Sequence, residues 1–206
     1  VDLSKGLSEN GIEIISTGGT SKAISEAGIP VRPVEEVTNF PEMMGGRVKT
    51  LHPLIFGGIL GRDSDKNQME EHGIENIDMV ICNLYPFKSA AEKGVDLSSL
   101  IEEIDIGGPS LLRAASKNHS RVSVVTDPGD YGWILSEISN GGLTFEQRQQ
   151  LALKSFRHTA EYDSIIQSVL AQRFGEEELS SSLHLTGIGS PPLRYGENPH
   201  QSSVFY

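Results

Sequence analysis

The chain has 206 residues, a hydrophobic share of 37% and a formal net charge of −11 at pH 7. This composition supports a folded core and excludes global disorder, and the acidic balance argues against a nucleic-acid surface, which needs a basic stripe. The single cysteine, Cys82, excludes a disulfide framework within the chain and is typical of a reducing cytoplasm. No apolar run approaches the length of a membrane span.

The first residues predict helices and strands joined by glycine-rich turns. Residues Val1–Asn10 carry a partial apolar stripe that predicts the end of a helix, stopped by Gly11. The β-branched run Ile12–Ser16 predicts a strand, and Ser21–Ala27 predicts the helix that follows it, which Gly28 closes. Because a helix beside a parallel sheet crosses over from an earlier strand, we expect a strand before the first residue.

A glycine pair connects this strand and helix, in the segment Thr17-Gly18-Gly19-Thr20. A strand, a glycine-rich turn and a helix in that order point backbone N–H groups and a helix N-terminus at an anion. Many such turns need glycine only for backbone geometry. The flanking hydroxyls favour phosphate modestly.

A second polar cluster follows the pair Gly45-Gly46 and comprises Arg47, Lys49, Thr50 and His52. Two cations, a hydroxyl and an imidazole suit a phosphorylated, carbonyl-bearing substrate, because fixed charge holds the anion and a donor polarises the carbonyl. A solvated basic loop explains the same residues equally well. Taken alone, this stretch leaves both interpretations open.

The remaining segments alternate between strand and helix patterns. Short strands are predicted at residues 31–34, 78–84 and 121–125, and helices at 63–73, 97–104 and 110–116. This alternation predicts an α/β fold with a parallel sheet covered by helices on both faces. Thr144 with Gln147 forms a capping-box pattern that starts a helix from Phe145 to about Phe174. We therefore divide the chain into an α/β domain (1–126), a helical extension (127–186) and a linker that leads into a second domain (187–206).

The chemistry available from single residues is limited. None of the six histidines has a partner four positions away, which argues against a metal site. Cys82 lies in an apolar strand, which raises a thiol pKa and disfavours a nucleophilic role. Asp105 and Lys117 lie one at each end of a predicted helix, and an ordinary ion pair between them is the simplest explanation of both. Tyr85 lies at a strand end, where a tyrosine is explained most simply by packing.

Several stretches taken together are far more specific. In chain order they are Ser16–Thr20, Val37–Pro53, Asn83–Phe87, Ile104–Gly108, Arg113–His119 and Leu193–Gln201. The whole chain resembles the N-terminal part of the bifunctional purine biosynthesis protein family, which joins an IMP cyclohydrolase to an AICAR transformylase. The resemblance implies a methylglyoxal-synthase-like α/β fold. It also implies closure of the purine ring of 5-formamido-imidazole-4-carboxamide ribotide (FAICAR) to IMP, with release of water and without metal or cofactor.

The resemblance implies roles for individual residues. Four side chains would surround the reacting groups: Lys49, Tyr85, Asp105 and Lys117. The ribotide and its phosphate would be held by Thr17, Gly18, Gly19, Thr20, Arg47, Thr50, Asn83, Ile106 and Gly107. The family usually forms homodimers in the cytoplasm, with no nucleic acid or membrane as partner.

Two departures limit what the resemblance implies. The family begins with a strand and a Ser-x-Ser-Asp-Lys segment that this sequence does not contain. The transformylase domain, which uses 10-formyltetrahydrofolate, is represented only by its first residues. Arg194 and Tyr195 resemble residues that bind AICAR there, but the rest of that site is missing, so we expect no transformylase activity.

Two alternative functions are compatible with the same fold. One is a methylglyoxal synthase, whose own aspartate-containing loop we do not find, and the other is a regulatory nucleotide-binding module.

Overall fold

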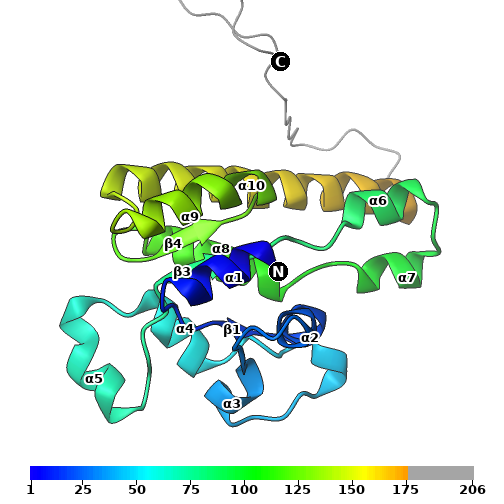
Figure 1. Ribbon diagram of the computed structural model, residues 1–206. Helices are drawn as coiled ribbons and strands as arrows, with labels where there is room; N and C mark the ends of the chain where they lie inside the picture. Colours follow the sequence, from blue (N-terminus) through cyan, green and yellow to red (C-terminus); the bar gives the residue numbers. More distant parts are fainter. Residues whose placement is uncertain (176–206) are drawn as a thin grey trace, which may run out of the picture. The chain divides into compact units, whose positions relative to one another are not determined.

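The computed structural model describes residues 1–175 (Figure 1). The chain divides into two compact units, Val1–Thr159 and Ala160–Tyr206, and helix α10 runs through the boundary between them. The helices are α1 (Asp2–Glu9), α2 (Gly18–Glu26), α3 (Val34–Thr38), α4 (Pro53–Leu60), α5 (Lys66–Glu71), α6 (Phe87–Glu92), α7 (Leu97–Glu102), α8 (Gly107–Lys117), α9 (Tyr131–Ser139) and α10 (Phe145–Phe174). Three short 3-10 turns are η1 (Met44–Gly46), η2 (Asp63–Asp65) and η3 (Pro128–Asp130).

The strands form two parallel pairs. Strand β1 (Ile15–Ser16) pairs with β2 (Arg32–Pro33), and β3 (Met79–Ile81) pairs with β4 (Ser123–Val125). Parallel pairs joined by helices confirm the α/β class. The expected continuous sheet is not found, because among the described residues no ladder joins one pair to the other.

Several predicted boundaries were wrong, in two consistent ways. The strands are shorter than their apolar runs: of residues 12–16 only Ile15–Ser16 is strand, and of residues 78–84 only Met79–Ile81. An apolar run records burial, whereas a strand also needs a paired neighbour. Two helices begin earlier than predicted, α2 at Gly18 and α8 at Gly107, because each Gly-Gly pair forms the first helical turn instead of a preceding loop.

The core of the first unit lies around β4 and α8. All three residues of β4 are buried, and α8 packs against β3, β4 and α4 (Figure 1). The buried side chains come from several elements and include Ile55, Ile59, Val80, Leu112, Val122, Val124, Val125, Ile134 and Leu151. Full burial of one such side chain contributes roughly 1.5–3 kcal/mol. This packing fixes α8 and therefore the position of its N-terminus.

Helix α4 starts and ends on specific side chains. His52 is its N-cap, with Nδ1 accepting a hydrogen bond from the backbone N–H of Leu54 at 3.2 Å, and Pro53 occupies the first turn. At the other end, Asn118 donates to the carbonyl oxygens of Ile59 (2.8 Å) and Gly61 (3.1 Å). The imidazole of His52 therefore has a structural role. Asn118 shares the carbonyl groups at the helix end with Arg121, which also donates to the carbonyl oxygens of Ile59 and Gly61, both at 3.2 Å.

The start of α10 agrees with the sequence prediction. Thr144 Oγ1 accepts from the backbone N–H of Gln147 at 3.2 Å, and the Gln147 side chain accepts from the Thr144 N–H at 2.7 Å. This reciprocal pair is the predicted capping box. In the described part of the chain, no helix is both long and apolar enough to cross a membrane.

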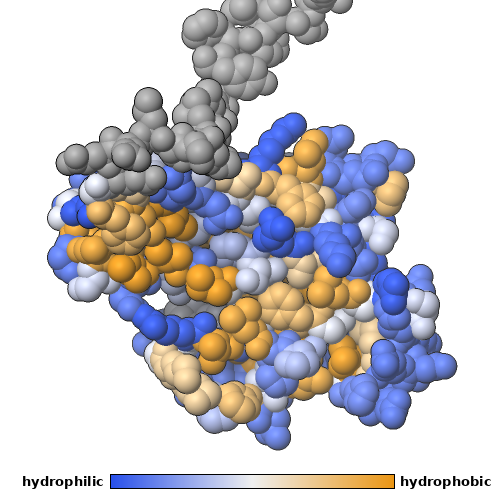
Figure 2. All heavy atoms as spheres, turned by 180° about the vertical axis from the view of Figure 1, so that it is seen from behind, coloured by the Kyte–Doolittle hydropathy of each residue, from blue (hydrophilic) through white to orange (hydrophobic). Residues whose placement is uncertain are grey.

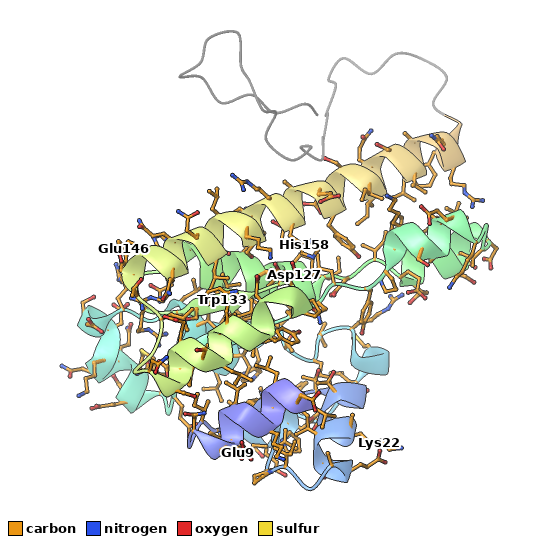
Figure 3. All side chains as sticks on the ribbon, turned by 45° about the horizontal axis from the view of Figure 1, so that its top comes forward. Glu9, Lys22, Asp127, Trp133, Glu146 and His158 are labelled. Carbon is orange, nitrogen blue, oxygen red and sulfur yellow. The ribbon has the colours of Figure 1, made fainter. Side chains whose placement is uncertain are left out.

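A charged cluster joins α10 to the segment after β4. Lys154 donates to Asp127 Oδ2 and Asp130 Oδ2, both at 2.7 Å, and Trp133 Nε1 donates to Asp130 Oδ1 at 3.2 Å. Figure 3 labels Asp127 and Trp133 beside the first half of α10. The Lys154 ammonium holds the pKa of Asp127 below its usual value of 3.8.

Replacement of Lys154 by methionine is expected to lower stability most at neutral pH. Because the folded-state pKa of Asp127 is depressed, the pairing stabilises the fold above about pH 4 and is lost as the pH falls through the folded value. The loss at neutral pH should be about 1 kcal/mol, since both partners are partly exposed. Urea unfolding at neutral and acidic pH measures it.

The matched control is Lys22→Met, which removes an exposed lysine 3.8 Å from Glu26 and should change little. An equal loss for Lys154→Met at both pH values would show that the Lys154–Asp127 pairing does not carry the effect.

Candidate functional site

The N-terminus of α2 has the geometry of an anion site. Thr17 is the N-cap with extended backbone (φ −128°, ψ 156°), and its side chain makes no capping hydrogen bond. Gly18 has φ +51°, in the left-handed region that favours glycine. The N–H groups of Gly18, Gly19 and Thr20 belong to the first helical turn, where they have no acceptor within the helix and the helix dipole is positive.

Lys49 brings a fixed cation to this helix end. A Cβ atom added at Gly18 would lie 3.9 Å from Lys49 Nζ. The ammonium pairs with Glu42 and, at 3.2 Å, with Glu35, and only 13% of the lysine side chain is exposed. The hydrogen bond to Glu42 is the largest cause that raises the pKa of Lys49 above its ordinary 10.5. Lys49 is therefore a permanent cation at neutral pH.

The segment that carries Lys49 also contacts the N-terminus of α8. A Cβ atom added at Gly107 would lie 2.9 Å from Thr50 Oγ1, so glycine is needed for this approach. Arg47 forms an ion pair with Glu102, the last residue of α7. Both partners are exposed, so this pair contributes little to stability. Residues 47–50 thus reach the N-termini of two helices, α2 and α8.

Asp105 lies at the start of α8 with its carboxylate turned back onto the helix. The Gly108 N–H donates to Asp105 Oδ1 at 2.8 Å. A Cβ atom at Gly108 would lie 2.4 Å from Asp105 Oδ2 and 2.8 Å from Leu84 Cδ2. The carboxylate can occupy this place only because residue 108 is glycine.

Gly108→Ala is expected to displace the Asp105 carboxylate and destabilise the fold by about 1–3 kcal/mol, because the added methyl meets the side chains of two partly buried neighbours, Asp105 and Leu84. Thermal unfolding measures the loss. The control Gly132→Ala adds the same methyl to α9 where no atom lies within 4 Å, and should be neutral or stabilising. Equal melting temperatures for the two variants would contradict the predicted contact.

Cys82 and Asn83 follow strand β3. Burial raises the pKa of the Cys82 thiol to about 12, with a further contribution from the negative charge of Asp105. The sequence prediction of a raised thiol pKa is confirmed. Asn83 Nδ2 donates to the hydroxyl oxygen of Tyr131 at 3.1 Å. The end of β3 therefore lies close to the Asp105 turn.

The structure joins some of the residues proposed from sequence and separates others. Gly18 with Lys49 and Thr50 with Gly107 are two neighbouring pairs of these residues, and Asp105 lies near Cys82, which was not among them. Tyr85 is 59% exposed and Ile106 is equally exposed.

Lys117 is the last residue of α8, about 15 Å of helix rise from Gly107. The predicted helix-end ion pair between Lys117 and Asp105 lies beyond side-chain reach. Arg194 and Tyr195 lie outside the described residues, as does the predicted linker at 187–206.

The sequence interpretation missed the acidic partners of the two cations. Glu35 and Glu42 hold Lys49, and Glu102 holds Arg47. For Glu35 and Glu42 the available signal was their position shortly before the basic cluster, and acidic residues are common on exposed surfaces. Glu102 lies far along the chain and gave no such signal. In the part of the chain that the structure describes, no group of three or more His, Cys, Asp or Glu side chains could hold a metal ion.

Comparisons with known proteins identify the class of this fold and site. Residues 1–110 match the family model of the MGS-like domain, and residues 115–206 match that of the AICARFT/IMPCHase bienzyme. The chain belongs to the MGS-like domain family. Over its whole length it is also similar to the bifunctional purine biosynthesis protein PurH, so the resemblance inferred from the motifs is confirmed.

The similarity to individual relatives is high. PurH of Oceanobacillus iheyensis is 54% identical, that of Persephonella marina 50% and that of Bartonella bacilliformis 51%, each over all of this chain. The chain spans about two fifths of these relatives, 41%, 41% and 39% of their lengths. A solved structure, described as the crystal structure of ForH, matches with a TM-score of 0.72 and 34% identity, covering 82% of this chain and 91% of that one.

Proposed function

We propose that this chain forms an IMP cyclohydrolase, which closes FAICAR to IMP with release of water. The observation that carries the proposal is the convergence of three features: the α2 N-terminus, the Lys49 ammonium and the Asp105 turn at the start of α8. The names of the relatives, bifunctional purine biosynthesis proteins, support the same pathway.

The phosphate of the ribotide is assigned to the start of α2. The N–H groups of Gly18–Thr20 and the Thr17 hydroxyl supply donors, and the helix dipole favours a dianion there. Lys49, Arg47 and Thr50 add charge and a hydroxyl from the neighbouring segment. Asn83, Ile106 and Gly107 are assigned to the rest of the ribotide, at the end of β3 and the start of α8.

Ring closure needs little more than placement and charge. The carboxamide nitrogen attacks the formyl carbon and gives up one proton. The formyl oxygen, which receives that proton and a second one from the formamido nitrogen, departs as water and leaves a C=N bond in the ring. The ammonium of Lys49 and the phenol of Tyr85 are suited to stabilise the developing oxyanion, and the carboxylate of Asp105 to accept the proton. Because both reacting ends belong to one molecule, holding them together supplies much of the rate.

The wider assignments belong to the same proposal. The cyclohydrolase step uses no metal or organic cofactor, whereas 10-formyltetrahydrofolate serves the transformylase of the complete bienzyme. We assign the protein to the cytoplasm and to a homodimer. Hydrophobic side chains reach the surface between hydrophilic ones on the face shown in Figure 2. The exposed hydrophobic residues of the chain include Phe40, Met44, Tyr85 and Ile106, which are suited to contact a ligand or a second subunit.

A spectrophotometric assay of IMP formation from FAICAR tests the activity. Turnover that requires the chain supports a cyclohydrolase, and methylglyoxal release from dihydroxyacetone phosphate would indicate the synthase instead. The exposed position of Lys117, far along α8 from Asp105, favours one second candidate, a regulatory nucleotide-binding module. Such a module would bind IMP without converting FAICAR.

A further inference from the structure

The two carboxylates that hold Lys49 come from segments of different rigidity. Glu35 belongs to α3, which is anchored by buried Val34 and by buried Thr38, whose hydroxyl donates to the Val34 carbonyl oxygen at 3.0 Å. The Glu35 side chain is 30% exposed. Glu42 lies between α3 and η1, outside any helix or strand, and its side chain is 48% exposed. Glu35 is thus held on a helix, whereas Glu42 lies in an irregular segment and is the more exposed of the two carboxylates.

The local charge is unfavourable for an anionic ligand. One ammonium with two carboxylates leaves a net negative charge beside the α2 N-terminus. A phosphate bound at that helix end would lie close to both carboxylates, and like charges at such distances repel appreciably even in a partly solvated site. One of the carboxylates therefore has to leave Lys49 when the anion binds, and the better candidate is Glu42, which is more exposed and lies outside the helix that carries Glu35.

We propose that Glu42 is an exchangeable partner of Lys49 whose place is taken by the anionic group of the ligand, while Glu35 is a positioning residue that keeps the ammonium at the α2 N-terminus. The identity of the ligand, a nucleoside monophosphate, rests on the proposed function. Glu42 competes with the ligand, and Glu35 acts on the reaction only through Lys49. Substitution of Glu42 should therefore change the affinity for the ligand, whereas substitution of Glu35 should change the turnover number.

The first test is the affinity for IMP, measured by titration calorimetry with inosine as the ligand that lacks a phosphate. Glu42→Gln removes the competing charge and should tighten IMP binding by about fivefold, leaving inosine binding unchanged. The control Glu36→Gln neutralises an exposed carboxylate one residue along from Glu35 and should alter neither affinity. Unchanged or weaker IMP binding, an equal gain for inosine, or no IMP binding by any variant would overturn the proposal.

The second test is turnover of FAICAR in the complete gene product. Glu35→Gln should lower kcat by about tenfold with little change in KM, because a misplaced ammonium still attracts the anion but no longer meets the reacting carbonyl. Glu36→Gln is again the control, and melting temperatures exclude unfolding. An unchanged kcat, or a loss confined to KM, would overturn the positioning role. If the wild-type protein makes no IMP, the proposed function fails, and the binding test alone decides on Glu42.

Discussion

Replacement of Lys49 by alanine is expected to reduce the rate of ring closure by about two to three powers of ten, with a much smaller effect on stability. The ammonium lies beside the α2 N-terminus, where two carboxylates hold it. Its positive charge can therefore stabilise a bound anion or a developing oxyanion at this helix end. Steady-state kinetics with FAICAR, together with thermal unfolding, separate the two effects.

The matched control is Lys66→Ala, which removes an exposed lysine of α5 that lies 3.9 Å from Glu70. Tyr85→Phe and Asp105→Asn should show smaller losses parallel to that of Lys49→Ala, and the effects should not add if the residues share one step. An unchanged rate in Lys49→Ala would exclude a catalytic role. A lowered melting temperature with normal kinetics would make Lys49 a structural residue.

Cys82 is expected to react with thiol reagents about a thousandfold more slowly in the native protein than in the unfolded chain. Burial and the Asp105 charge raise the thiol pKa from 9.0 to about 12, and only the thiolate is the nucleophile. Alkylation by iodoacetamide at about pH 8, followed by mass spectrometry with and without concentrated urea, measures the ratio.

Asp105→Asn provides the control for the charge contribution. Because the carboxylate is the smaller cause of the raised pKa, the variant should react somewhat faster than the wild type and still far more slowly than the unfolded chain. Equal rates in the native and unfolded protein would contradict the burial of this thiol.

Local patterns in the sequence predicted the elements that depend on local interactions. Helix α10 begins and ends at Phe145 and Phe174 as expected, because its capping box and apolar stripe are properties of consecutive residues. Gly11 and Gly28, predicted as helix stops, have φ of +74° and +72° in the structure. These conformations favour glycine, so the residue type alone indicated where each helix ends.

Features that depend on distant contacts were predicted less well. The extent of β1 and β3 depends on pairing with β2 and β4, which apolar runs do not record. At the site, the glycines and hydroxyls of the α2 turn were visible as a motif. The approach of Thr50 to Gly107 and the pairing of Lys49 with Glu35 join segments that only the fold brings together.

The most direct test of the candidate site is a crystal structure of the protein with bound IMP. The phosphate oxygens are expected to accept hydrogen bonds from the backbone N–H groups of Gly18, Gly19 and Thr20, with Lys49 directed at the ligand. A phosphate bound at Gly107–Gly108 instead, with the α2 N-terminus free of ligand, would contradict the assignment of the phosphate site.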